Sequence, residues 1–309
     1  MLTNLFSKSR PIGYIAIGLL LLVVYFLQLI SDLSWLQSPT AVIEKIILFF
    51  AVVFSVLLIQ FITVKNNLAV NNLYSLFFYA CFLIIFPTYF DDSELIIANL
   101  LILLALRRII SLQSLKLPKI KIFDASLWIF FATIFESWTI LYFLMIYLAI
   151  IWYVSEDYRH WILPLVALFT VTVLFYTYSI IIDIDFIDYW KNKYTVGFNF
   201  NYFDNVYQNI GISLFATIAV FFIANQFMQL KKIKPNQLNL YKNIVLCFII
   251  GVVIYSIAPE KSNGLLVFTF FPLSIIGGNF IKNNESSWVK ETVLSMTLIL
   301  SLILFLLKL

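Results

Sequence analysis

The chain has 309 residues, of which 62% belong to the apolar set AVILMFWYC and only 12% are charged, and its mean hydropathy is +0.98. A soluble domain of this length cannot hide so much apolar surface from water, because the surface of a folded domain grows almost as fast as its mass. The composition therefore excludes a secreted domain, a nucleic-acid-binding protein and a cytosolic enzyme, and it predicts a membrane protein.

Cysteine and histidine are too scarce to build a metal centre or a disulfide framework. The two cysteines, Cys81 and Cys247, lie within apolar runs, where small buried hydrophobic residues are the ordinary interpretation. The single histidine, His160, cannot supply the several ligands of an iron or zinc site. The sequence thus predicts no haem, iron or zinc. It also lacks a glycine-rich phosphate-binding motif, which argues against ATP-driven pumping by this chain.

Apolar runs follow one another along the whole chain. A helix needs about 20 apolar residues to cross about 30 Å of hydrocarbon. The runs that predict such helices are 11–30, 43–64, 68–88, 95–110, 123–136, 138–154, 161–182, 210–230, 243–258, 264–281 and 292–309. We expect an all-α polytopic transmembrane bundle of about 11 helices, forming one domain over 1–309. It divides into a front module (11–182), a long outer loop (183–209) and back helices (210–309).

The fourth and fifth runs, 95–110 and 123–136, are short for a full crossing. A re-entrant hairpin of the two would place the five charges between Arg107 and Lys121 at membrane depth. Each charge there would cost several kcal/mol, about 3 on the lenient insertion scale. We therefore expect two separate crossings.

The positions of the basic residues predict the orientation. If the first helix runs outwards, the segments on the inner side hold fifteen of the 20 Lys and Arg residues. This excess predicts an N-in, C-out protein of the bacterial inner (cytoplasmic) membrane. Eleven of the 16 acidic residues fall on the outer side. Acidic residues contribute little to orientation, so their excess points to a function at the outer face.

An acidic cluster follows the third helix. Asp91, Asp92 and Glu94 lie within four residues, and Asp32 in the first outer loop is placed to join them in space. The ordinary interpretation is a solvated turn that caps the next helix. The functional interpretation is a general base or a site for a divalent cation such as Mg²⁺, which carboxylate oxygens bind.

The long outer loop interleaves aromatic, acidic and basic residues. Trp190 and Tyr194 flank the lysines Lys191 and Lys193. An interfacial segment with aromatic rings at headgroup level explains this composition. The alternative is a substrate platform, in which rings stack on a sugar and the two lysines bind a lipid phosphate.

The inner loop from Arg107 to Lys121 carries five basic residues beside the membrane. Anchoring to anionic membrane lipids explains it.

Few polar groups interrupt the predicted membrane interior. Asn99, Asn225 and Gln226 are polar but neutral. Proton- and ion-coupled carriers usually have ionisable groups in mid-span, so the sequence argues against such a carrier. Pro272 predicts a kink in the tenth run, which also holds the adjacent glycines Gly277 and Gly278.

Several segments carry a resemblance. They are Phe-Ser-Lys-Ser-Arg-Pro-Ile (6–12), Leu-Ile-Leu-Leu-Ala-Leu-Arg-Arg (101–108), Phe-Asp-Ala-Ser-Leu-Trp (123–128) and Tyr-Arg-His-Trp-Ile-Leu-Pro (158–164). In these segments the first half resembles an uncharacterised family of bacterial inner-membrane proteins of about 300 residues.

The order of helices and outer acidic turns in the first half is also similar to the front module of GT-C glycosyltransferases. That resemblance implies an enzyme that takes a sugar from a polyprenyl-phosphate donor at the outer face. It places Asp32 and then Asp91, Asp92 and Glu94 at the acidic positions of that family. The first outer loop here spans only about a dozen residues from Ser31, which is shorter than in those enzymes.

Three functions follow as hypotheses. In a transferase, Asp32 or Asp91 activates an acceptor hydroxyl, Asp92 and Glu94 orient it or hold a metal, and the two loop lysines bind the donor phosphate. A non-catalytic subunit or scaffold of an envelope or secretion complex is the second hypothesis. A small-molecule carrier with a midplane site beside Pro272, Asn99 or Asn225 is the third.

Overall fold

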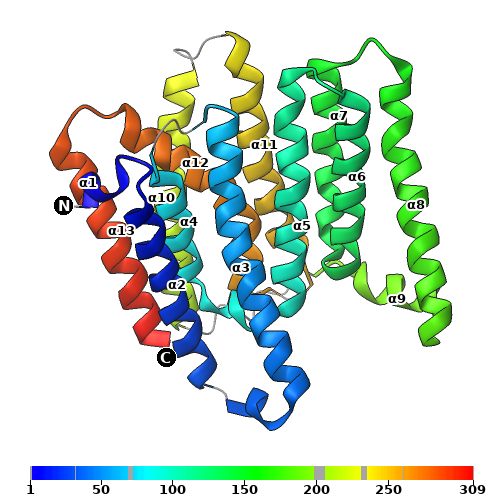
Figure 1. Ribbon diagram of the computed structural model, residues 1–309, viewed down its shortest axis with the longest axis horizontal. Helices are drawn as coiled ribbons and strands as arrows, with labels where there is room; N and C mark the ends of the chain where they lie inside the picture. Colours follow the sequence, from blue (N-terminus) through cyan, green and yellow to red (C-terminus); the bar gives the residue numbers. More distant parts are fainter. Residues whose placement is uncertain are drawn as a thin grey trace.

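The computed structural model describes residues 2–31, 33–68, 72–197, 206–230, 235–259 and 261–308. Over these ranges the chain is helical and contains no β-strand (Figure 1). The α-helices are α1 (Leu2–Phe6), α2 (Pro11–Ser31), α3 (Pro39–Lys65), α4 (Tyr74–Ile85), α5 (Ser93–Ile110), α6 (Pro118–Phe135), α7 (Tyr142–Tyr153), α8 (Tyr158–Ile182), α9 (Phe186–Lys193), α10 (Val206–Leu230), α11 (Pro235–Ile257), α12 (Val267–Asn283) and α13 (Ser287–Lys308). The all-α fold predicted from the apolar runs is confirmed.

Eight helical segments of the described residues are long and apolar enough to cross a membrane. They lie in α2, α3, α5, α8, α10, α11, α12 and α13. The helices α4 and α7 are apolar but have only 12 residues each, which is about 18 Å of helix. The chain is a multi-pass membrane protein, while the number of crossings, eleven by the sequence, stays a prediction.

The two short apolar runs form α5 and α6, which pack against each other. Their connection lies at the same end of the bundle as the connections between α3 and α4 and between α7 and α8 (Figure 1). The helix α5 is one of the eight spans. The helix α6 includes Lys119, Lys121 and Asp124 among its 18 residues, so its crossing stays a prediction.

The centre of the bundle consists of α4 and α12. Every residue of α4 is buried, and so is every residue of α12 from Val267 to Ile281. A helix that is apolar all round is suited to such a position, because each of its faces meets another helix. The helix α12 contacts α4, α5, α10 and α11, while α4 contacts α2, α3 and α13. The α4–α12 pair therefore joins the first half of the chain to the second.

Glycines allow the helices at the centre to approach closely. A Cβ atom on Gly278 of α12 would lie 3.0 Å from the backbone nitrogen of Ser75 in α4. A Cβ atom on Gly251 of α11 would lie 2.8 Å from the carbonyl of Phe268 in α12. Small residues at helix contacts are typical of membrane proteins, where close packing replaces the hydrophobic driving force.

Two of the amides that the sequence singles out form hydrogen bonds within the bundle. The Nδ2 of Asn99 in α5 donates to the hydroxyls of Tyr79 and Tyr89 at 2.8 and 3.2 Å. The Nδ2 of Asn225 donates to the carbonyl of Phe221 one turn earlier in α10. Both amides thus contribute to packing and helix geometry. A carrier site at these positions stays a prediction.

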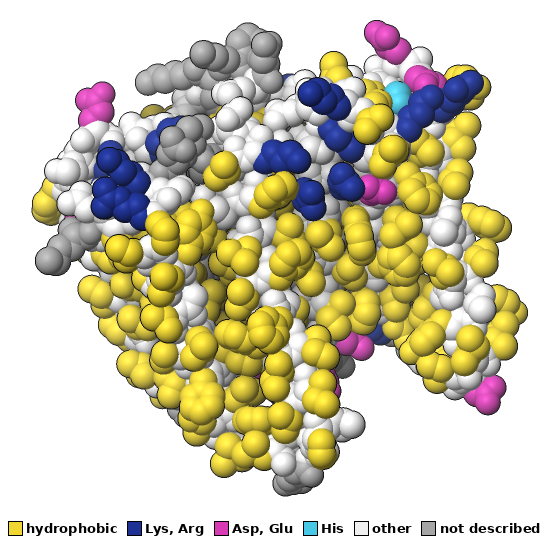
Figure 2. Space-filling view, viewed as in Figure 1, with side chains coloured by type: hydrophobic (Ala, Val, Ile, Leu, Met, Phe, Trp, Pro, Cys, Tyr) yellow, Lys and Arg dark blue, Asp and Glu magenta, His cyan; other side chains and the backbone are white. Residues whose placement is uncertain are grey.

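The two ends of the bundle differ in charge. Apolar side chains cover the middle of the molecule, and the Lys and Arg side chains visible in Figure 2 gather at one end. We call this the basic end; it holds the α3–α4, α5–α6 and α7–α8 connections. The opposite end holds the connections from α4 to α5, α6 to α7 and α11 to α12. The sequence places the basic end in the cytoplasm, and this orientation stays a prediction.

Replacing Gly278 with Ala tests the α4–α12 contact. The new methyl group would meet the Ser75 backbone, and overpacking of this kind costs about 1–3 kcal/mol. We expect Gly278→Ala to lower the thermal midpoint of the detergent-solubilised protein. The control is Gly18→Ala in α2, where a Cβ atom has no neighbour within 4 Å. Equal midpoints for the two variants would contradict the close approach.

Cysteine labelling tests the orientation. Both native cysteines are buried, so background reaction with a membrane-impermeant maleimide is low. We expect intact cells to be labelled in an Asp188→Cys variant, which places the thiol at the exposed opposite end. A Glu285→Cys variant, exposed between α12 and α13, should react only after the membrane is opened. The reverse pattern would show that the basic end faces outwards.

Candidate functional site

A cavity of about 570 Å³ lies at the opposite end of the bundle. It forms where the start of α5, the end of α6, the end of α9 and the α11–α12 connection meet. We call it the outer pocket. Its lining residues are Asp92, Glu94, Leu95, Phe135, Glu136, Ser137, Asn192, Lys193, Thr195, Ala258, Pro259, Lys261, Ser262 and Leu265. Four segments distant in sequence thus contribute charged side chains to one cavity.

The rim of the outer pocket is the N-terminus of α5. Asp92 is the N-cap residue, and its carboxylate accepts a hydrogen bond from the Leu95 N–H at 3.0 Å. Glu94 lies in the first turn and is exposed. Carboxylates are favoured at this position because the first N–H groups of a helix are unpaired and its dipole is positive there. Asp92 therefore has the capping role that its position in the sequence favours.

Lys193, the last residue of α9, connects three elements at the outer pocket. Its Nζ donates to Glu94 Oε2 at 2.8 Å and to the Phe135 carbonyl at 2.7 Å. Burial alone would lower the pKa of Lys193, but hydrogen bonds to Glu94 and Tyr189 outweigh burial, and the net pKa is raised. The ammonium group stays charged at neutral pH and fixes α9 against the C-terminus of α6.

Glu136 is the half-buried acid of the outer pocket. It ends α6, and its carboxylate accepts the Trp138 N–H at 3.4 Å. Burial raises the pKa of this carboxyl above its ordinary value. The Trp138 N–H and Lys193 oppose that shift, whereas the carboxylates of the rim add to it. A carboxyl with a raised pKa that lines a cavity is a candidate proton acceptor.

Lys261 is a buried cation on the α11–α12 side of the pocket. Its Nζ donates to the Ser256 carbonyl at 2.9 Å and to the Gly197 carbonyl at 3.1 Å. Gly197 lies so close to Pro259 that a Cβ atom would be 2.6 Å from its Cα. These contacts hold the segment after α9 against the α11–α12 connection, which gives this part of the pocket a defined shape.

The predicted acidic cluster is divided by the fold. Asp92 and Glu94 line the outer pocket, but Asp91 is oriented towards α2, where both of its oxygens accept hydrogen bonds from Gln28 Nε2 at 2.8 and 2.9 Å. Asp32, the fourth predicted acid, lies outside the described residues. The structure therefore brings two of the four predicted carboxylates together.

The predicted substrate residues are divided as well. Lys193 lines the outer pocket, whereas Lys191 is exposed and lies 3.9 Å from Asp188 within α9. Trp190 and Tyr194 stack with ring centroids 5.4 Å apart and line a separate cavity of about 180 Å³ among α6, α8 and α9. We call this second cavity the aromatic pocket. Since Lys193 and Tyr194 are adjacent in sequence, the two pockets are neighbours.

Two charged residues of the outer pocket are absent from the sequence-based candidates. Glu136 and Lys261 belong to short connections that gave no recognisable motif. The only signal for Glu136 in the sequence is its position directly after an apolar helix. A carboxylate there does not cap the helix that ends, but it can cap the helix that follows. Its proximity to Lys193 depends on long-range packing and has no local signature.

No group of three His, Cys, Asp or Glu residues suited to a metal ion occurs in the part of the chain that the structure describes. The outer carboxylates are partnered instead by N–H groups and by Lys193.

Comparison with known proteins identifies a family whose function is unknown. All 309 residues, 1–309, match the model of a protein family described as a family of unknown function, DUF6427. No curated protein and no solved structure matches the chain. The resemblance to an uncharacterised family that the sequence predicts is thus confirmed over the whole chain.

A Glu136→Gln variant tests the environment of this carboxyl through pH-dependent stability. Because the folded-state pKa is raised, ionisation above the ordinary value of 4.5 costs folding free energy. Glutamine avoids that cost and still accepts the Trp138 N–H. We expect the variant to be more stable than the wild type at pH 8, and the gain to disappear below about pH 4.5. A gain of the same size at pH 4 and pH 8, measured by thermal unfolding in detergent, would contradict the raised pKa.

Proposed function

We propose that this chain, which belongs to the DUF6427 family of unknown function, is a membrane-embedded transferase that acts on a lipid-linked sugar at the outer pocket. The proposed general base differs from the one expected from the sequence, which is Asp32 or Asp91. Lys193 is a phosphate-binding residue in both assignments. Glu136 is the general base, and Lys193 is a cation of the same pocket that would bind a donor phosphate. The donor class rests on the resemblance of the helix order to GT-C glycosyltransferases.

The half-buried Glu136 carboxyl is the observation that supports the proposal best. Its pKa is raised by burial, and it lines a cavity of about 570 Å³ with Lys193 and Lys261. General bases work best when their pKa lies near the operating pH, and burial is the usual means of raising the pKa of a carboxyl. The predicted orientation places this cavity at the outer face, where lipid-linked sugars are used.

The proposed reaction is a direct displacement. The Glu136 carboxylate takes the proton of an acceptor hydroxyl, and the acceptor oxygen bonds to the anomeric carbon of the sugar. The bond from that carbon to the phosphate oxygen breaks, and its electron pair leaves with the polyprenyl phosphate. The Lys193 ammonium lies in the same cavity and offsets the negative charge that the phosphate gains. The aromatic rings of Trp190 and Tyr194 next to the pocket supply a surface for the sugar or the lipid.

A non-catalytic membrane subunit is the second candidate. It is favoured by the hydrogen bonds that already occupy the pocket. Lys193 donates to Glu94 and to two carbonyls, Lys261 donates to two carbonyls, and Asp92 caps α5. Such a cluster fixes the connections of the bundle without any substrate. In that role, the end of the bundle that holds the outer pocket would contact a partner protein of the envelope.

Transfer activity in cells separates the two candidates. In a strain lacking the gene, we expect wild-type protein to restore a lipid-linked or surface glycan detected by mass spectrometry. Glu136→Gln should reduce that product by about 100-fold or more, since general bases contribute 10²–10⁴-fold. The matched control, Glu156→Gln, changes an exposed carboxylate at the basic end and should restore the glycan in full.

Two results would contradict the transferase. One is a full yield of glycan from folded Glu136→Gln protein. The other is an unchanged glycan profile in the deletion strain, together with copurification of one partner at fixed stoichiometry by wild type and variant. The second result would establish the non-catalytic subunit.

A further inference from the structure

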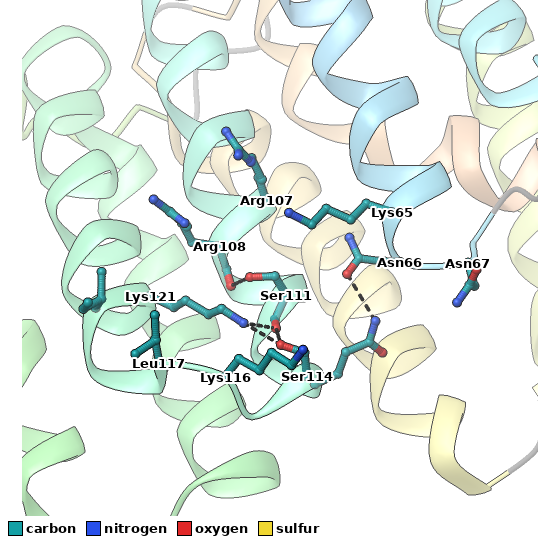
Figure 3. Close-up of a pocket in the computed structure, with 12 residues that line it drawn as sticks. Lys65, Asn66, Asn67, Arg107, Arg108, Ser111, Ser114, Lys116, Leu117 and Lys121 are labelled. Atoms are coloured by element: carbon teal, nitrogen blue, oxygen red, sulfur yellow. Dashed lines mark hydrogen bonds between the residues drawn. The ribbon is translucent and has the colours of Figure 1, made fainter.

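A second large cavity, of about 560 Å³, lies at the basic end of the bundle. We call it the basic pocket. It forms among the end of α3, the end of α5 and the start of α6 (Figure 3). It is remote from the outer pocket, which lies at the opposite end of the same helices. Its chemistry is therefore independent of the proposed transferase.

The basic pocket concentrates positive charge. Its cationic side chains are Lys65, Arg107, Arg108, Lys116 and Lys121 (Figure 3). Arg108 pairs with Asp124 at 2.7 Å. The other four form no ion pair with a carboxylate of the described residues. Like charges gathered in this way repel one another unless an anion is bound.

One aromatic ring holds two of these cations together. The Cζ of Arg107 lies 4.6 Å, and the Nζ of Lys65 5.1 Å, from the centre of the Phe61 ring. The ring attracts both groups without neutralising either of them, since its quadrupole carries no net charge. Both therefore keep their full charge for a ligand at the pocket.

The helix dipoles do not account for the whole cluster. Arg107 and Arg108 lie in the last turn of α5, where positive charge is favoured. Lys116 lies instead just before α6 and Lys121 in its first turns, near the helix end where the dipole disfavours positive charge. Lys121 Nζ donates to the Ser111 carbonyl and to Ser114 Oγ, which keeps it at the pocket. An anion would gain from these lysines and from the α6 N-terminus together.

The backbone around the basic pocket is strained. Asn67, Leu115 and Leu117 have φ values of 56°, 55° and 49°, three of the four positive values among non-glycine residues of the described chain. Leucine adopts this conformation rarely, because its Cβ clashes with the backbone. Asn66 is fixed by hydrogen bonds with Ile62 and Gln113. Strained backbone concentrated at one cavity is typical of a binding site.

We propose that the basic pocket binds the phosphate group of an anionic ligand. Arginine presents a planar fork of N–H donors that matches phosphate oxygens, and lysine adds compact positive charge. The rim points to a membrane lipid as one source of the phosphate. Leu115, Leu117 and Ile120 are 58%, 70% and 53% exposed there, and such side chains are suited to contact with lipid chains. A free phosphate is the other source.

Direct binding to the purified full chain in detergent tests this proposal. The probes are dioctanoyl phosphatidylglycerol and sodium phosphate, measured by thermophoresis, with dioctanoyl phosphatidylcholine as the uncharged comparison. We expect Lys65→Gln/Arg107→Gln to weaken binding of at least one anionic probe tenfold or more. The matched control, Lys8→Gln/Arg10→Gln, removes one exposed lysine and one exposed arginine outside the pocket and should change the affinity less than twofold.

The outcomes separate the sources of phosphate. Loss of affinity for phosphatidylglycerol alone assigns a lipid headgroup, and loss for sodium phosphate assigns a soluble ligand. Equal affinities of the pocket variant and the control for both anionic probes would overturn the proposal. If the double variant does not fold, as judged by circular dichroism, Lys116→Gln replaces it, because that residue lies in an exposed connection and should weaken the same probe.

Discussion

The contact between α4 and α12 is the constraint on which the rest of the structure depends. A membrane supplies no hydrophobic force between helices, so two helices remain together only if their backbones pack closely or their polar groups bond. Here Gly278 allows the α12 backbone to reach Ser75, and the aromatic residues of α4 pack around the same contact. Because α12 also contacts α5, α10 and α11, this pair connects the helices of the first half to those of the second.

The sequence predicts the helices well because the bilayer imposes a simple rule of length and apolarity. It does not predict which helices are central, since an apolar face can meet either lipid or protein. The adjacent glycines Gly277 and Gly278 are a local sign that α12 packs closely against its neighbours. The candidate site is harder to predict. Asp91 and Asp92 are neighbours, yet one contacts α2 and the other caps α5, because successive side chains in a turn diverge.

The charged side chains at the two ends of the bundle are arranged differently. At the outer pocket, opposite charges are paired, as between Glu94 and Lys193, and burial raises the pKa of the Glu136 carboxyl beside them. At the basic pocket, like charges gather and only Arg108 is paired with a described carboxylate. A paired cluster can orient and transfer a proton, whereas an unpaired one is suited to hold an anion. One molecule thus presents different chemistry to the two sides of a membrane.

The separation of α4 and α12 along the chain has a consequence for biogenesis. The chain enters the membrane from its N-terminus, so α4 emerges from the ribosome long before residues 267–283 are synthesised. During that interval α4, which is buried along its whole length in the finished fold, lacks the partner that covers it. Completion of the fold therefore waits for almost the entire chain. Any product truncated ahead of α12 would lack the helix with which α4 makes its most extensive contact.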